Sequence, residues 1–595
     1  MSTLVSNSDE KNSIEHVEMS ETAHKLDHSN QRQTLEGNLH YINTETEPEL
    51  GFQTYMALSA LFALNLVQVF ALTGPVSILA YIGRDLNDTA NQAWISTALS
   101  IMQAVFGPIM SFASDSFQAR KVFLIGPCLV AFAGCAVAPG ATSLVRVVGA
   151  QIMIGVGFAA VPLAYAIPSE ILPRRWRPMA QSLNNVAANC GFVMGLTVPG
   201  ALTRKSLHNG WRQFYWIQMA VWGLTALALA FGYQPPKRKT ELDNQPLSHK
   251  LRSLDLPGTA LLAAGLALFI TGLSLGGNPR PWDSAAVLAP LIVGAAVLIA
   301  FGTYEWKCTT TGILHHQLFA GGRAFPLFMV LIFVEGIQLF SLLVFYTPTT
   351  EALFETDPLL APVRLLPFVL ASAVATLVYG FWSTKARDVR WPLLVGFVIF
   401  AAGLAAIAGS LQPTSSTSFV VLGGLCGAGF GAPLILIIAG TQLCVPHSLI
   451  ATGTAVITST RAVAAAIFTA SYSTALTNRL SVKIPGYIAP AALQAGLPPQ
   501  SLPPFIGALA NNQPQALAGV PGVTPVAIEA GIVALRHALA DSFRIVYLIA
   551  APFGVVAVVA ALFLPSFRDT MHYEVDAPVE ELQAKSKVGQ EACAA

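Results

Sequence analysis

Two ionisable residues lie in the middle of long apolar stretches, where charge is costly. Glu335 lies within IFVEGIQLF and Arg461 within VITSTRAVAAAIF. A charged side chain at the centre of a bilayer costs about 2.5–3.5 kcal/mol, so such residues usually face a bundle interior or a wet cavity. We therefore predict a substrate or proton site at these residues, with direct pairing between them as one option. The alternative is a structural ion pair that only fixes helix packing.

Four amide side chains also fall within apolar stretches, at Asn65, Gln68, Gln151 and Gln338. Gln338 follows Glu335 by about one helical turn. Amides at this depth either line a polar cavity or make hydrogen bonds from helix to helix. The sequence leaves both roles open for all four residues.

Acids and bases meet at the ends of two apolar stretches. Asp115 lies in SDSFQARK and is followed by Arg120, and Glu170 lies in SEILPRRWR and is followed by Arg174. Acids and bases on adjacent helix ends can form a latch that closes one face of a helix bundle. The alternative is a simple excess of basic residues on the inner side of a membrane, which explains the arginines but neither acid.

Small residues repeat at the spacing that lets helices approach closely. Gly191 and Gly195 are four residues apart, and so are Gly427 and Gly431. This spacing predicts close helix packing at both places.

The chain lacks the motifs of several other functional classes. It has no phosphate-binding loop that ends in Lys-Ser or Lys-Thr and no cluster of His, Cys and Asp at metal-ligand spacing. It also has no nucleophile elbow and no basic-aromatic stripe. We therefore expect no enzyme activity, no cofactor, no metal and no nucleic-acid partner.

The elements that position these residues are about fourteen apolar segments. Of the 595 residues, 54% are hydrophobic and only 11% are charged, which is typical of a polytopic membrane protein. The predicted spans lie near 54–80, 92–112, 122–139, 144–166, 180–201, 213–232, 256–275, 284–304, 326–347, 360–382, 392–410, 418–443, 449–474 and 543–564.

The distribution of basic residues predicts the orientation. With both termini in the cytoplasm, the short inner loops hold far more Lys and Arg than the outer ones. The polar tails 1–50 and 566–595 are then cytoplasmic, and the N-terminal tail is predicted to be disordered. The long outer segment 477–542 is expected to be a spacer whose end, 525–541, is helical; a lid is the less favoured interpretation. Asn87 begins a glycosylation sequon on the first outer loop.

Several segments, taken in order, resemble the major facilitator superfamily. They include SDSFQARK, GAQIMIGVGF with SEILPRRWRPMAQ, WRQFYWIQ, LDLPGTALLAAGLALFITGLSLGGNPRPW and RAVAAAIFTASYSTALTNRL. The chain is most similar to the fungal fourteen-helix drug:proton antiporters, in particular to trichothecene efflux pumps and siderophore transporters. The resemblance implies an all-α fold of two six-helix bundles, 51–232 and 326–565, with two inserted helices in 233–325. Alternating access would occur at a central cavity.

The sequence departs from the family pattern where proton relays are expected. Asn65 and Gln68 stand in the helix where many relatives carry Asp, and Gln151 replaces an Arg. In the loop of Asp115, Gln118 and Ala119 stand where the pattern has Gly and Arg. Glu335 is then the best remaining membrane carboxylate for proton coupling.

We therefore expect a monomeric plasma-membrane transporter that exports a small amphipathic molecule, such as a trichothecene-like fungal metabolite, by proton antiport. A siderophore importer and a broad multidrug exporter are the alternatives. The short tails argue against a membrane sensor built on the same fold.

Overall fold

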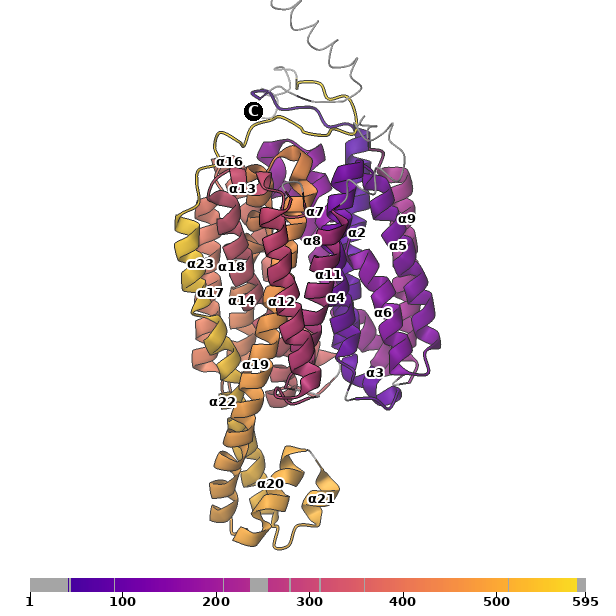
Figure 1. Cartoon of the computed structure of the whole chain (residues 1–595). Coiled ribbons are helices and arrows are strands. Elements are labelled where there is room, and N and C mark those ends of the chain that lie inside the picture. The colour runs from indigo at the N-terminus through magenta and orange to yellow at the C-terminus, as the bar shows by residue number, and fades with distance from the viewer. Residues whose placement is uncertain are drawn as a thin grey trace, which may run out of the picture.

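The computed structural model describes residues 41, 44–89, 91–206, 208–235, 255–277, 280–309, 312–357, 359–511 and 513–585. Fourteen helices in these residues are long and apolar enough to cross a membrane. They stand side by side in one bundle (Figure 1). The described parts of both tails lie at one end of the bundle, which we call the terminal face; the opposite end is the distal face. The fourteen predicted spans agree with these helices, although several helices are longer than predicted.

The first half of the bundle runs from the first to the sixth span. Its helices are α2 (Phe52–Ser77), α3 (Leu79–Asp85), α4 (Trp94–Phe117), α5 (Arg120–Val137), α6 (Leu144–Phe158), α7 (Val161–Ile171), α8 (Arg177–Lys205) and α9 (Gly210–Gly232). The fourth span is thus divided into α6 and α7. The inserted pair that follows is α11 (Leu256–Leu275) and α12 (Ala285–Lys307), which pack against each other.

The second half holds the remaining six spans. Its helices are α13 (Gln317–Ala320), α14 (Ala324–Leu353), α15 (Leu360–Val363), α16 (Leu366–Ala386), α17 (Arg390–Ser410), α18 (Ser416–Cys444), α19 (Ile450–Gln494), α20 (Leu502–Ala510), α21 (Pro514–Ala518), α22 (Pro525–Ala550) and α23 (Phe553–Leu562). The two halves meet where α4 packs on α19 and α8 packs on α16, and α11 packs beside α4 and α19.

The paired glycines lie at the closest helix contacts. A side chain at Gly191 would collide with the carbonyl oxygen of Leu66 in α2, and one at Gly195 would collide with Thr73. In the second half, a side chain at Gly427 would collide with the carbonyl oxygen of Phe368 in α16. Gly431 approaches the same helix at Ala375. The structure therefore places both glycine pairs where the backbones of two helices touch.

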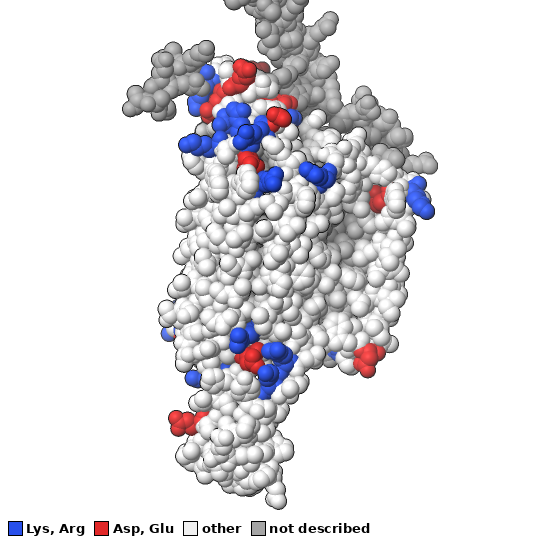
Figure 2. Space-filling model, turned by 90° about the vertical axis from the view of Figure 1, so that its left-hand side faces the viewer, with Lys and Arg blue, Asp and Glu red and all other residues white. Residues whose placement is uncertain are grey.

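Charged residues gather at the two ends of the bundle. Figure 2 shows a broad band without charged side chains between them on the side that it presents. This band has the character of a lipid-facing surface, since charged groups are excluded from the hydrocarbon core of a bilayer.

The segment 477–542 differs from the spacer that its Pro-rich composition predicts. The helix α19 continues through Pro485 and Pro490 to Gln494. The helix α20 and the start of α22 pack beside it, and α21 packs on α20. Figure 1 shows this part, which we call the extension, projecting from the distal face. It has its own apolar cluster around Ile488, Phe505 and Leu509. The apolar residues between the prolines are thus sufficient to bury a small core.

The C-terminal tail, for which the sequence predicts only a polar, cytoplasmic segment, packs onto the terminal face over residues 567–585. We call this segment the strap; it is the yellow chain across the top of the bundle in Figure 1. Met571 and Val575 on the strap are fully buried. Most of the N-terminal tail, for which disorder is predicted, lies outside the described residues.

Candidate functional site

Glu335 and Arg461 form an ion pair within the bundle. Nε of Arg461 lies 2.7 Å from a carboxylate oxygen of Glu335. The Glu335 side chain is fully buried, whereas 15% of the Arg461 side chain is exposed. The pair joins α14 to α19, as the sequence suggested that it could.

The ion pair is only partly satisfied. The second carboxylate oxygen of Glu335 and one terminal nitrogen of Arg461 have no hydrogen-bond partner among the described residues. Tyr165 of α7, in the first half, lies near enough to interact electrostatically with both charges. The backbones come close here because Gly336 packs against the Arg461 carbonyl and Ala464. A buried ion pair with unused hydrogen-bonding capacity can exchange a proton or bind a polar substrate group.

Two of the four predicted amides, Gln68 and Gln151, connect helices. Gln68 donates to the Gly157 carbonyl at 3.1 Å, and Gln151 donates to the Tyr215 hydroxyl at 2.8 Å. Asn65 bonds only within its own helix, to the Leu61 carbonyl at 3.5 Å. These contacts fit the helix-packing interpretation better than the cavity-lining one.

Gln338 does not join Glu335. Its amide lies against Gly554 of α23, whereas Glu335 faces α19. Neither polar atom of the Gln338 amide has a hydrogen-bond partner among the described residues. The structure therefore separates these two predicted site residues although one helix carries both.

At the terminal face, Arg120 binds two acids at once. Its guanidinium lies 2.6 Å from Asp115 and 2.5 Å from Glu170. All three side chains are at most 6% exposed. The cluster ties the ends of α4, α5 and α7 together within the first half.

Asp115 also connects this cluster to the second half of the bundle. Its other carboxylate oxygen accepts hydrogen bonds from the backbone N–H of Thr452, at 2.7 Å, and from the Thr452 hydroxyl, at 2.5 Å. Thr452 lies in the first turn of α19, where unpaired N–H groups and the helix dipole favour an anion. Asp115 of one half thus caps a helix of the other.

A second set of polar contacts also connects the two halves at the terminal face. Arg177 donates to the carbonyls of Ser169 and Gln442, and Gln442 also accepts from the Ser169 hydroxyl at 2.6 Å. Gln442 belongs to α18 in the second half. We call the polar contacts of Asp115, Ser169 and Arg177 with Thr452 and Gln442 the latch.

Arg174, which the sequence grouped with Glu170, takes a different partner. It forms ion pairs with Asp576 at 2.6 Å and with Glu574 at 3.0 Å, both on the strap. Asp576 also pairs with Arg177. Burial alone would raise the pKa of Asp576, but the Arg177 and Arg174 guanidiniums outweigh burial and hold that pKa below its usual range.

Sequence reasoning missed Arg177, Gln442, Thr452 and Asp576. Arg177 belongs to the same PRRWR run as Arg174 and could have been grouped with it. The other three carry no local signal, because their partners are hundreds of residues away along the chain.

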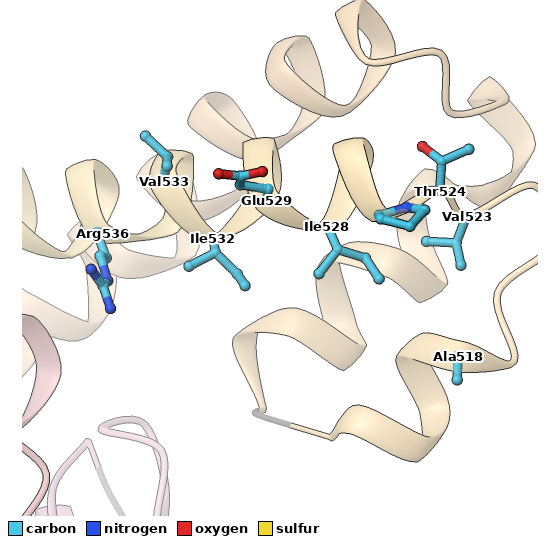
Figure 3. Close-up of a pocket in the computed structure, with 9 residues that line it drawn as sticks. Ala518, Val523, Thr524, Ile528, Glu529, Ile532, Val533 and Arg536 are labelled. Carbon is cyan, nitrogen blue, oxygen red and sulfur yellow. The ribbon is translucent and has the colours of Figure 1, made fainter.

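A separate depression lies on the extension. It has a volume of ≈ 660 Å³ and is lined by the outer turns of α22, including Ile528, Ile532 and Arg536. Figure 3 shows these side chains along one helix, with Ala518 on a facing segment. It is distant from the Glu335 pair, since the extension projects beyond the bundle (Figure 1). Among the described residues, no group of three His, Cys, Asp or Glu side chains is placed to hold a metal ion.

Known proteins with similar sequences are fungal transporters. The chain is 25% identical over 517 residues to trichothecene efflux pump TRI12 of Fusarium sporotrichioides, which covers 85% of each chain. It is 27% identical to the MFS-type transporter prx5 of Penicillium rubens, over 73% of this chain and 79% of that one. It is 25% identical to efflux pump apf11 of Gibberella fujikuroi, over 69% of this chain and 74% of that one.

Solved structures show the same fold at lower sequence identity. The major facilitator proton:xylose symporter XylE, bound to 6-bromo-6-deoxy-D-glucose, matches 87% of this chain and 97% of its own, with a TM-score of 0.55 and 13% identity. At this identity the likeness shows the fold alone.

The model of the fungal trichothecene efflux pump (TRI12) family matches residues 45–591, nearly the whole chain. Together with the fourteen spans and the two linked halves, this match shows that the chain belongs to the fungal trichothecene efflux pump family of major facilitator transporters and is not an enzyme.

Proposed function

We propose that this protein exports a small, amphipathic, mostly neutral metabolite across the fungal plasma membrane by proton antiport. Its relatives include a trichothecene efflux pump and the efflux pump apf11. Within the bundle, the Glu335 pair offers one acid and one base of opposite charge, which do not favour a highly charged substrate. The terminal face is cytoplasmic in this proposal.

The buried pair Glu335–Arg461 is the single observation that carries the coupling step. Protonation of the carboxylate would remove its charge and weaken its attraction to Arg461. Arg461 lies on α19, and the first turn of the same helix holds the Thr452 contact of the latch. A proton at Glu335 therefore acts on the helix that closes the terminal face. Substrate that reaches the freed polar groups would compete with the proton for this site.

The test compares two changes on one helix. In purified protein reconstituted into liposomes, Glu335→Gln is expected to reduce transport driven by a proton gradient by about 100-fold, while counterflow of labelled substrate without a gradient continues. Glu351→Gln, which alters an exposed acid on the same helix, is the matched control and is expected to transport normally. Candidate substrates are a trichothecene and a ferric siderophore.

Three results would contradict the proposal. Full gradient-driven transport by Glu335→Gln would exclude Glu335 as the coupling group. Siderophore uptake into cells would show import in place of export. Loss of counterflow together with gradient-driven transport would indicate that Glu335 serves binding or structure and not coupling.

The orientation has an independent test at Asn87. This residue is exposed and follows α3 in the chain, and Figure 1 shows α3 at the distal face. We expect its sequon to be glycosylated, because the proposal places the distal face outside the cell. A glycosidase-dependent mobility shift that Asn87→Gln abolishes would support this orientation.

A further inference from the structure

The strap is anchored in the second half of the bundle at its beginning. Phe567 is 3% exposed and packs against Phe328 of α14, with 5.9 Å between ring centroids. Met571, one turn further, is fully buried in the same apolar core. This anchor is apolar and follows directly from the last span.

The strap then crosses to the first half, where it pairs with the chain between α7 and α8. The backbone N–H of Arg175 donates to the His572 carbonyl at 2.8 Å, and that of Arg174 donates to the Glu574 carbonyl at 3.0 Å. The N–H of Ala577 donates to the Glu170 carbonyl at 2.8 Å. The Arg175 side chain adds a 2.7 Å hydrogen bond to the Tyr573 hydroxyl. The middle of the strap, residues 572–577, is thus held by Glu170 and by the loop that carries Arg174 and Arg175.

Asp576 lies where the strap meets both halves of the bundle. It is 3% exposed and pairs with Arg174 and Arg177 of the first half. Arg177 simultaneously donates to the Gln442 carbonyl of the second half. Asp576 therefore balances the charge of the arginine that bridges the two halves.

Beyond this junction, the strap reaches the N-terminus of α2. Gly51, the residue before this helix, has no side chain to cap it, and Glu580 takes that role. Its carboxylate accepts from the Gly51 N–H at 2.7 Å, from the Thr54 N–H at 3.3 Å and from the Thr54 hydroxyl. An acid at a helix N-terminus is stabilised by the unpaired N–H groups and by the helix dipole.

We propose that the strap is a built-in clamp that holds the terminal face closed and must detach from the first half each time this face opens. The face opens only if the halves separate at the latch. A segment fixed to Phe328 on one half and to Arg174, Arg177 and α2 on the other resists that separation. The ionic and hydrogen-bonded anchor on the first half is the one that releases, because water can replace its partners, whereas detaching the Phe567 anchor exposes apolar surface.

Cys444 provides a direct measure of opening. It is the last residue of α18, two positions after Gln442, and it is only partly accessible. The exposed Cys190 and Cys308, and Cys593 beyond the described residues, are replaced by Ala so that Cys444 is the thiol that reacts; the other three are buried. The rate of maleimide labelling of Cys444 in membranes then reports how often the terminal face opens.

In this background, Asp576→Asn is expected to increase the labelling rate by about tenfold, since it removes two charge-assisted contacts without changing shape. Glu580→Gln, which weakens only the α2 cap, is expected to give about a threefold increase. Glu581→Gln makes the same chemical change at an exposed strap position and should leave the rate unchanged.

Equal labelling rates in all three variants would overturn the clamp. If Asp576→Asn does not give a monodisperse protein, the labelling rates of Glu580→Gln and Glu581→Gln are compared instead. Equal rates for these two variants would overturn the clamp. The measurement needs neither a substrate nor a proton gradient, so it fails or succeeds independently of the role proposed for Glu335.

Discussion

The terminal and distal faces of the bundle are connected across the two halves in very different ways. On the terminal face, buried side chains of Asp115 and Arg177 reach backbone groups of the second half. On the distal face, Arg204 and Asp357 approach only to 3.8 Å, and the Arg204 side chain is 59% exposed. Exposed pairs contribute little to stability, whereas buried polar networks are costly to break. The terminal face is therefore the one that requires energy to open.

The largest expected effect comes from Arg120, at the centre of the buried acid cluster. Arg120→Ala leaves Asp115 and Glu170 buried without their shared partner. Breaking a buried ion pair in this way costs about 3–5 kcal/mol. We expect a clear fall in the unfolding temperature of the detergent-purified protein. An unchanged unfolding temperature would mean that water already reaches this cluster.

A smaller effect is expected from pH, through the strap. Because the folded-state pKa of Asp576 lies below its usual 3.8, its ion pairs stabilise the protein above that value and lose this contribution as the pH falls through the folded pKa. The stability difference between the wild type and Asp576→Asn should thus stay constant between pH 8 and about pH 5 and shrink below about pH 4. A difference that already disappears at pH 6 would show that Asp576 is not held as a carboxylate by Arg174 and Arg177.

The smallest effect is expected on the distal face. Arg204→Ala removes a long, exposed ion pair and should leave the unfolding temperature and the transport rate within error of the wild type. This variant is the counterpart of Arg120→Ala. A marked loss of stability would remove the contrast between the two faces.

The spans, and Glu335 and Arg461 as candidates for an ion pair, could be predicted because they depend on local sequence. Apolar length alone identifies a helix that crosses a bilayer, and Glu335 and Arg461 are conspicuous because charge is rare there. The spacing of Gly191 and Gly195 likewise indicates a close contact, although not its partner, α2.

What could not be predicted depends on distant residues or on weak local signals. The polar composition of residues 567–585 is typical of a disordered tail, and only Arg174 and Arg177, about 400 positions earlier, give Asp576 a place to bind. The sequence predicts a span that ends near residue 474 and a spacer beyond it, whereas α19 continues to Gln494 through Pro485 and Pro490, two residues of a type that usually interrupts a helix. The packing of α19 against α22 stabilises this continuation. Gln118 adopts a left-handed conformation with φ of 50°, a conformation that Gly, the residue that the resemblance leads us to expect here, adopts without strain.

The unbroken course of α19 has a mechanical consequence. Its 45 residues form a rod about 68 Å long, with Thr452 in its first turn, Arg461 within the membrane and the extension at its far end. A rotation that frees the first turn from Asp115 must also swing the far end outside the membrane. If the distal face lies outside the cell, as we propose, an antibody fragment that binds and immobilises the extension is expected to slow transport without entering the bundle.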